Sequence, residues 1–260
     1  RTGLTTIQSS AVSDNYSDTK QMGEFHVFSS ISMKPVEQLR LSVNLRESFH
    51  DNNAVFSPSV GMDVLLGTFT LRGQVSKGYR APTFNDRFWM PGGNPGLKAE
   101  RSENAELGFD FDKKNVSLSA TGFMSEVINW IQWVPTDGVF TPMNLREVFT
   151  RGIEFGSNIY FPLNSPKIIW KIDYEYTLST DKSLENDNQL PYVPKHSGYS
   201  SVAFSRKSLL LSLVGNYTGL RYTTLTNSRQ SEIDEFWLFD VVLESTQILR
   251  KSNLTFRLSL

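Results

Sequence analysis

Residues that could bind a large flat ligand are concentrated between Ser76 and Gly108. Aromatic rings offer stacking surfaces for a ring system, and amide or charged groups offer contacts to its periphery. The predicted ligand contacts are Tyr79, Phe84, Asn85, Asp86 and Trp89. The alternative is that these residues only shape a loop, since not every loop residue carries function. Arg80 in particular is expected to be structural.

Other chemistry is poorly supported by the sequence. Cysteine is absent, which excludes disulfides, Cys-zinc sites and a thiol nucleophile. The three histidines, His26, His50 and His196, have no metal-ligand spacing and are interpreted as isolated surface imidazoles. A haem-type contact at His50, beside Asp51, is the weaker alternative. We predict no metal and no cofactor.

Acidic residues could in principle bind calcium or act in catalysis. Asp181, Glu185, Asp187 and Asn188 match no calcium-loop order and are interpreted as a solvated loop. No Ser or Asp has an ordered catalytic partner, and no phosphate-binding glycine loop is present. We therefore predict that the chain is not an enzyme. Its net charge of −1 gives no reason to expect a nucleic-acid partner.

The elements that position these residues follow a period of two, which is typical of β-strands. In residues 167–178, Ile168, Trp170, Ile172 and Tyr174 share one side, while charged residues occupy the other. The sequence predicts about twelve strands in this 260-residue chain. They span residues 23–34, 37–48, 56–66, 68–78, 102–112, 115–132, 148–162, 167–180, 195–205, 207–221, 234–247 and 252–260.

The predicted connections alternate between short and long. Short ones are expected at 35–37, 67, 113–115, 162–166, 205–207 and 249–252, and long ones at 50–56, 79–101, 133–148, 181–194 and 222–234. Residues 1–20 are interpreted as the mobile end of another long loop. Short turns at one rim and long loops at the other are typical of an outer-membrane β-barrel.

Full charges on the polar side favour a wide, wet lumen, because a tightly packed interior would be destabilised by them. Aromatic residues near strand ends suggest girdles at the membrane interfaces. They are Trp130, Trp133, Tyr160, Phe161, Trp170, Trp237 and Phe239. The fold class is therefore predicted as all-β, an antiparallel transmembrane β-barrel, present in part. The alternative is a β-sandwich with these rings in its core.

Three motifs resemble the late barrel of TonB-dependent outer-membrane receptors. Lys77-Gly-Tyr-Arg-Ala-Pro82 resembles a run that ends one strand in that family, and Gly93-Asn-Pro-Gly-Leu-Lys-Ala-Glu100 resembles the run that leads into the next strand. Asn144, Gly152 and Glu154 match a strand start, and Tyr217–Tyr222 matches a Tyr-x-Gly-x-Arg-Tyr run followed by Trp237–Asp240. Within the family the chain is most similar to the cobalamin receptors.

This resemblance implies a barrel of about twenty-two strands around a plug. Residues 1–260 would form only part of that barrel, with the plug, its TonB-contacting box and the last hairpin absent, so the ends are expected to be limits of a fragment. An open part of a barrel would expose unpaired strand edges and is not expected to transport alone.

The implied function is TonB-dependent import of a scarce nutrient across the bacterial outer membrane, with a corrinoid as ligand. Implied partners are outer-membrane lipid, the TonB complex through the plug, and the small-molecule ligand. A surface lipoprotein is a further possible partner. The alternatives are a siderophore or haem receptor, a soluble β-sandwich that binds carbohydrate, and, more remotely, an enzymatic barrel.

Overall fold

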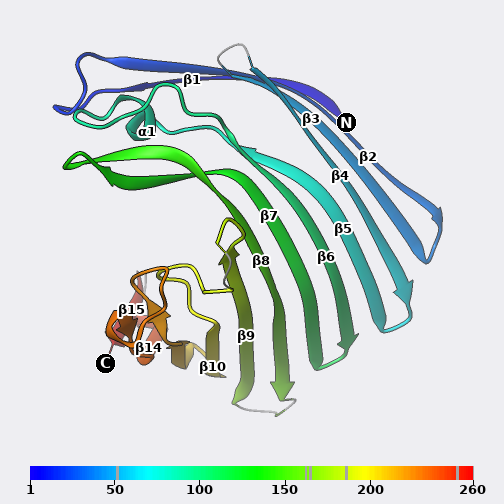
Figure 1. Ribbon diagram of the computed structural model, residues 1–260. Helices are drawn as coiled ribbons and strands as arrows, with labels where there is room; N and C mark the ends of the chain where they lie inside the picture. Colours follow the sequence, from blue (N-terminus) through cyan, green and yellow to red (C-terminus); the bar gives the residue numbers. More distant parts are fainter. Residues whose placement is uncertain (51–52, 162, 164–165, 185–186, 250–251, 260) are drawn as a thin grey trace.

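The residues that the structure describes form a curved antiparallel sheet of 13 strands, ordered as in the sequence, and a separate two-stranded sheet (Figure 1). The computed structural model describes residues 1–260 except 51–52, 162, 164–165, 185–186, 250–251 and 260. Parts of the predicted connections 50–56, 162–166, 181–194 and 249–252, and the ends of the predicted strands 148–162 and 252–260, lie outside the described residues. The strands are β1 (Thr2–Ala11), β2 (Lys20–Val36), β3 (Leu39–His50), β4 (Asn53–Leu66), β5 (Phe69–Arg80), β6 (Glu100–Lys113), β7 (Val116–Thr136), β8 (Val139–Phe161), β9 (Lys167–Asp181), β10 (His196–Arg206), β11 (Leu209–Thr218), β14 (Phe236–Leu249) and β15 (Ser252–Ser259).

All twelve predicted strands are present, and the interpretation of residues 1–20 as a loop was wrong for most of its length. Thr2–Ala11 forms β1, which pairs with β2 from Thr2 opposite Ser29 to Ala11 opposite Lys20. The segment has no apolar alternation, so its strand state depends on backbone pairing with a neighbour rather than on side-chain pattern.

The long connections were only partly predicted. Residues 81–99, 182–195 and 219–235 do separate consecutive strands of the sheet and carry helix α1 (Phe84–Phe88), helix η1 (Arg229–Ser231) and the short strands β12 (Arg221–Tyr222) and β13 (Glu232–Ile233). The predicted loops 50–56 and 133–148 were wrong, because β3, β4, β7 and β8 extend through them. β7 and β8 meet at Asp137-Gly138, where φ is 52° and 84°. Asp-Gly with two positive φ angles is the tight hairpin turn that keeps both strands in register.

In the part of the chain that the structure describes, no second large sheet packs on the apolar side of the 13-stranded sheet, so the β-sandwich alternative was wrong. The apolar side chains that are buried in the described part of the chain are Val55, Ile131, Val148, Leu190 and two prolines, Pro82 and Pro142. Trp237 is 56% exposed and Phe239 54%, whereas a sandwich would bury such rings in its core.

The opposite side of the sheet carries paired charges. Arg72 Nε donates to Asp110 Oδ2 at 2.6 Å, and Arg40 lies 3.4 Å from Asp63. Gly108 makes room for the first pair, because a Cβ there would lie 2.8 Å from the Arg72 guanidinium. The loop that carries α1 lies on the concave side of the sheet (Figure 1). Arg87 of α1 reaches His50 on the polar side, so the polar side is the concave one.

Two of the predicted girdle residues do not belong to a membrane-interface girdle. Trp133 donates its indole N–H to Asp86 of the 81–99 loop at 2.9 Å. Tyr160 lies on the concave side of β8 with Asn158, whereas Phe161 and Trp170 near the β8–β9 turn lie on the convex side and are 41% and 37% exposed. No helix in the described residues is both long and apolar enough to cross a membrane.

Candidate functional site

Helix α1 is a single turn that begins at Phe84 and is held by a reciprocal cap with Thr83. The Thr83 backbone N–H and hydroxyl donate to Asp86 Oδ2 at 2.9 and 2.8 Å, and the Asp86 N–H donates to Thr83 Oγ1 at 3.2 Å. This capping box satisfies donors that a helix start leaves open. It therefore fixes the direction in which the loop leaves β5.

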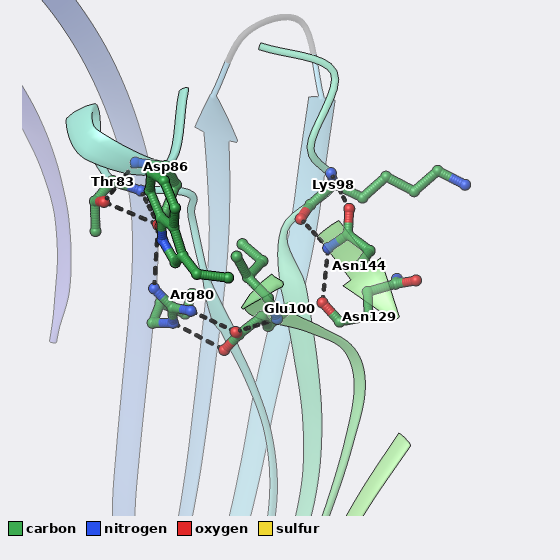
Figure 2. Close-up of polar contacts among 9 residues, drawn as sticks. Arg80, Thr83, Asp86, Lys98, Glu100, Asn129 and Asn144 are labelled. Atoms are coloured by element: carbon green, nitrogen blue, oxygen red, sulfur yellow. Dashed lines mark hydrogen bonds and ion pairs between the residues drawn. The ribbon is translucent and has the colours of Figure 1, made fainter. Parts of the chain in front are cut away.

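Asp86 also ties this loop to two strands of the sheet (Figure 2). Its Oδ1 accepts the Trp133 indole N–H, and its Oδ2 lies 3.7 Å from Arg80 Nη1. Arg80 forms a two-bond ion pair with Glu100, with Nε donating to Oε2 at 2.8 Å. We call Arg80, Thr83, Asp86, Glu100 and Trp133 the rim hub. Asp86 and Glu100 are 6% and 7% exposed, so both carboxylates depend on these partners.

Asn144 forms a second anchor beside the rim hub (Figure 2). Its Oδ1 accepts the Lys98 backbone N–H at 2.8 Å, and its Nδ2 donates to the carbonyls of Lys98 and Asn129 at 3.0 and 2.7 Å. Asn129 has a φ of 57° at an irregularity in the β7–β8 pairing. The Asn144 amide thus satisfies a carbonyl beside the interruption of the β7–β8 ladder and also holds the Lys98 backbone of the 81–99 loop.

The tip of the loop packs closely on the β7–β8 hairpin. Gly92 has a φ of 115°, and a Cβ there would lie 2.1 Å from the Phe140 carbonyl oxygen. Only glycine allows such an approach. Asn94 Nδ2 donates to the Pro142 carbonyl at 3.2 Å, which adds a polar contact to the same hairpin.

The connection between β1 and β2 completes this part of the rim. The Tyr16 hydroxyl donates to Asn85 Oδ1, and the Met90 N–H donates to the Asn15 carbonyl at 2.8 Å. Sequence reasoning missed Tyr16, because it lies in a polar segment that carries no periodic signal and was interpreted as mobile.

A second cluster joins the 182–195 and 219–235 loops. Gln189 is 1% exposed. Its Oε1 accepts the Ser179 N–H at 3.0 Å, and its Nε2 donates to the carbonyls of Thr177 and Val193 at 3.2 Å each. Its backbone N–H donates to Asn227 Oδ1 at 2.7 Å, and Asn227 Nδ2 donates back to the Gln189 carbonyl at 2.9 Å. This two-way contact fastens one loop to the other. Nothing in the local sequence around either residue predicted it.

Asp181 ends β9 beside this cluster and forms an ion pair with Arg146 of β8. Burial raises the pKa of the Asp181 carboxyl. Hydrogen bonds from Ser183 and the Arg146 guanidinium outweigh burial and leave the pKa below its ordinary value. The carboxylate is thus charged at neutral pH and holds the start of the 182–195 loop.

The structure separates the five predicted ligand contacts. Tyr79 lies on the convex side of β5 with Val75, whereas the other four belong to the 81–99 loop. Asn85 is exposed, Phe84 and Trp89 are half-buried, and Asp86 is buried in the rim hub. Direct ligand contact at these five positions stays a prediction.

The histidine interpretation needs a correction. His26 is 1% exposed and contacts Ser48 at 2.9 Å, so it is not a surface residue. Glu24 lies 3.1 Å from His26 and 3.9 Å from His50, because the β2–β3 register places all three on one side of the sheet. Asp51 lies outside the described residues.

The described residues contain no group of three His, Asp or Glu side chains arranged to hold a metal ion. Of the four residues considered for calcium, Glu185 lies outside the described part of the chain. Asp181 is engaged with Arg146 and Ser183, and Asn188 donates to the Leu225 carbonyl at 2.9 Å.

Comparison with known proteins gives one family. The family model "TonB dependent receptor-like, beta-barrel" matches residues 2–260. The vitamin B12 transporter BtuB of Photobacterium profundum is 31% identical over 169 residues, which is 63% of this chain and 27% of that protein. The ferrienterobactin receptor of Escherichia coli is 24% identical over 213 residues, or 70% of this chain and 28% of that protein.

Among solved structures, a mutant of the ferric enterobactin receptor PfeA from Pseudomonas aeruginosa has the same fold. It superimposes with a TM-score of 0.75 at 19% identity, covering 94% of this chain and 40% of that one. The aligned regions thus make up less than half of each of these relatives.

Proposed function

The chain belongs to the β-barrel family of TonB-dependent outer-membrane receptors, and on that premise we propose that it serves the import of a corrinoid. In this proposal it forms part of the barrel wall and of the outer loops that bind the ligand. The observation that carries the choice of ligand is the 31% identity to a protein named as a vitamin B12 transporter.

The rim geometry supports a ligand mouth built on the 81–99 loop. The rim hub fixes the base of this loop, and Tyr16 and the β7–β8 hairpin hold its sides. A ligand site gains affinity when its contacts are already in place before binding. Within the loop, Asn85 is exposed and Phe84 and Trp89 are half-buried, so these three members of the predicted set are the ones left accessible at the rim.

The rest of the transport cycle is part of the same proposal. The TonB complex would act through a plug domain inside the barrel. The charged concave side of the sheet would line the path of the ligand. The chain would break no bond, so we propose a transporter and not an enzyme. A surface lipoprotein remains an additional proposed partner at the outer loops.

A siderophore receptor is the second candidate. The 24% identity to the ferrienterobactin receptor covers more of the chain than the vitamin B12 transporter match does. The residues at the rim favour the corrinoid, because neutral amide and aromatic groups suit a ligand with an amide periphery better than a highly charged iron chelate.

The test uses the full-length receptor in outer membranes. Uptake of radiolabelled cyanocobalamin and of ferric enterobactin is measured with and without TonB. We expect TonB-dependent cobalamin uptake, and Asn85→Ala should weaken cobalamin binding roughly fivefold by removing one polar contact. Asn158→Ala, near the opposite end of β8, is the matched control and should bind normally. Uptake of the iron chelate without any cobalamin uptake would overturn the proposal.

A further inference from the structure

The convex side of the sheet, which faces lipid in this family, contains an apolar hollow of about 750 Å³. Val60, Leu107 and Ile153 form its walls. Gly73 and Gly122 lie at its floor, and a Cβ at either position would meet no atom within 4 Å. The hollow is therefore open to the membrane and wide enough for a flexible hydrocarbon chain.

The hollow continues toward the outer rim. Val75, Ala105 and Met124 line both this hollow and a second one of about 360 Å³. The second hollow ends among charged side chains, including Lys77 and Glu103. The two hollows together make one groove that is apolar over the middle of the sheet and polar at its outer end.

Arg151 lies beside this groove in an otherwise apolar row. The row runs across six strands through Val60, Val75, Ala105, Met124, Arg151 and Leu178. The Arg151 guanidinium lies 5.1 Å from the Phe149 ring centre, toward the outer rim. Among the described residues no carboxylate pairs with it, whereas Lys77 pairs with Glu103 and Lys182 with Glu126, each at 2.5 Å.

The position of Arg151 along β8 places it at the outer edge of the hydrocarbon. Arg151 lies ten positions before Phe161, which is at the short-turn end of the strand. At roughly 3.3 Å per residue and a tilt of about 40°, this corresponds to about 25 Å along the membrane normal. The apolar band of such barrels is about 25 Å tall. The guanidinium is thus at the height of the outer-leaflet headgroups.

We propose that this groove binds an outer-leaflet lipid with a phosphate headgroup, with an acyl chain in the hollow and the phosphate on Arg151. A guanidinium matches phosphate geometry with two parallel hydrogen bonds, and an unpaired one beside an apolar surface favours an anionic ligand. Arg101 lies on the same side, four residues outward of Ala105, and supplies a second guanidinium without a carboxylate partner in the described part of the chain. This inference rests on the membrane location and not on the proposed corrinoid.

The experiment measures lipid binding to the full-length receptor in neutral detergent by native mass spectrometry. The probes are lipid A, which carries phosphate on an acylated sugar, and its dephosphorylated derivative. We expect lipid A to bind roughly tenfold more tightly than the derivative, because a charged hydrogen-bonded contact is lost in the latter. Arg151→Gln should reduce lipid A binding by a similar factor, and Arg151→Lys should retain part of it.

Two further variants separate headgroup from chain. Gly122→Leu fills the hollow without meeting a neighbouring atom at its Cβ, and should weaken both probes alike. Lys171→Gln removes one positive charge from the concave side of the next strand and should change neither. Equal binding of the two probes, or equal loss in Arg151→Gln and Lys171→Gln, would overturn the proposal. Thermal unfolding of every variant, followed by circular dichroism of the β-sheet, verifies folding without reference to any transported ligand.

Discussion

Replacing Asp86 with alanine should open the 81–99 loop while leaving the barrel intact. The substitution removes the acceptor of the Trp133 indole N–H at 2.9 Å and the reciprocal half of the Thr83 cap. A hydrogen bond to a charged group contributes roughly 1.5–3 kcal/mol, and a helix cap about 1 kcal/mol. We therefore expect the free energy of local opening to fall by roughly 2–4 kcal/mol.

Hydrogen exchange measures this opening directly. The Asn94 N–H donates to the Asp86 carbonyl at 2.8 Å, so its protection reports whether the loop is folded. A loss of about 2 kcal/mol corresponds to roughly thirtyfold faster exchange in residues 84–96. Strand amides in β5 and β6 should keep their protection. Asp18→Ala removes an exposed carboxylate from the neighbouring 12–19 connection and is the matched control.

A double-mutant cycle isolates the contact between the loop and β7. Trp133→Phe retains an aromatic ring but has no indole N–H, so the pair should show a coupling energy of roughly 1–2 kcal/mol. Unchanged exchange in Asp86→Ala, or additive effects of the two substitutions, would refute the reasoning that Asp86 holds the loop to the sheet.

Two further predictions concern the same rim. Gly92→Ala should detach the loop tip from the hairpin and lower the free energy of unfolding by more than about 1 kcal/mol, because φ is 115° and the Cβ would meet the Phe140 carbonyl oxygen. Thermal unfolding and hydrogen exchange test this, with Gly122→Ala as the control because a Cβ there meets no atom. The pKa of Asp181 is lower in the folded rim than its ordinary value of 3.8, so the ionised carboxylate stabilises the folded rim. This stabilisation is complete above pH 3.8 and is lost as the pH falls through the lower folded pKa. Hydrogen exchange in residues 182–195 should accelerate below pH 3.8, and Arg146→Gln should weaken that pH dependence. An exchange rate that does not change with pH, after correction for intrinsic exchange, would contradict this role of Asp181.

Much of the sheet was predictable because a half-exposed strand imposes a period of two on its sequence. Ile168, Trp170 and Ile172 indicated β9 for this reason, and the other predicted strands also appear. β1 was missed because its residues lack this alternation. The Asp137-Gly138 hairpin was also missed, although the dipeptide is a strong local signal for a two-residue turn.

Motifs and alternation are local properties of the chain, so from them we could predict the family, every strand of the sheet except β1, and the loop that holds four of the five candidate ligand contacts. Which side chains meet at the rim depends instead on the three-dimensional fold. Asp86 and Trp133 are 47 residues apart, and Gln189 and Asn227 are 38 apart. Such pairs form because sheet register and loop packing bring distant segments together, and no local pattern of residues specifies those distances.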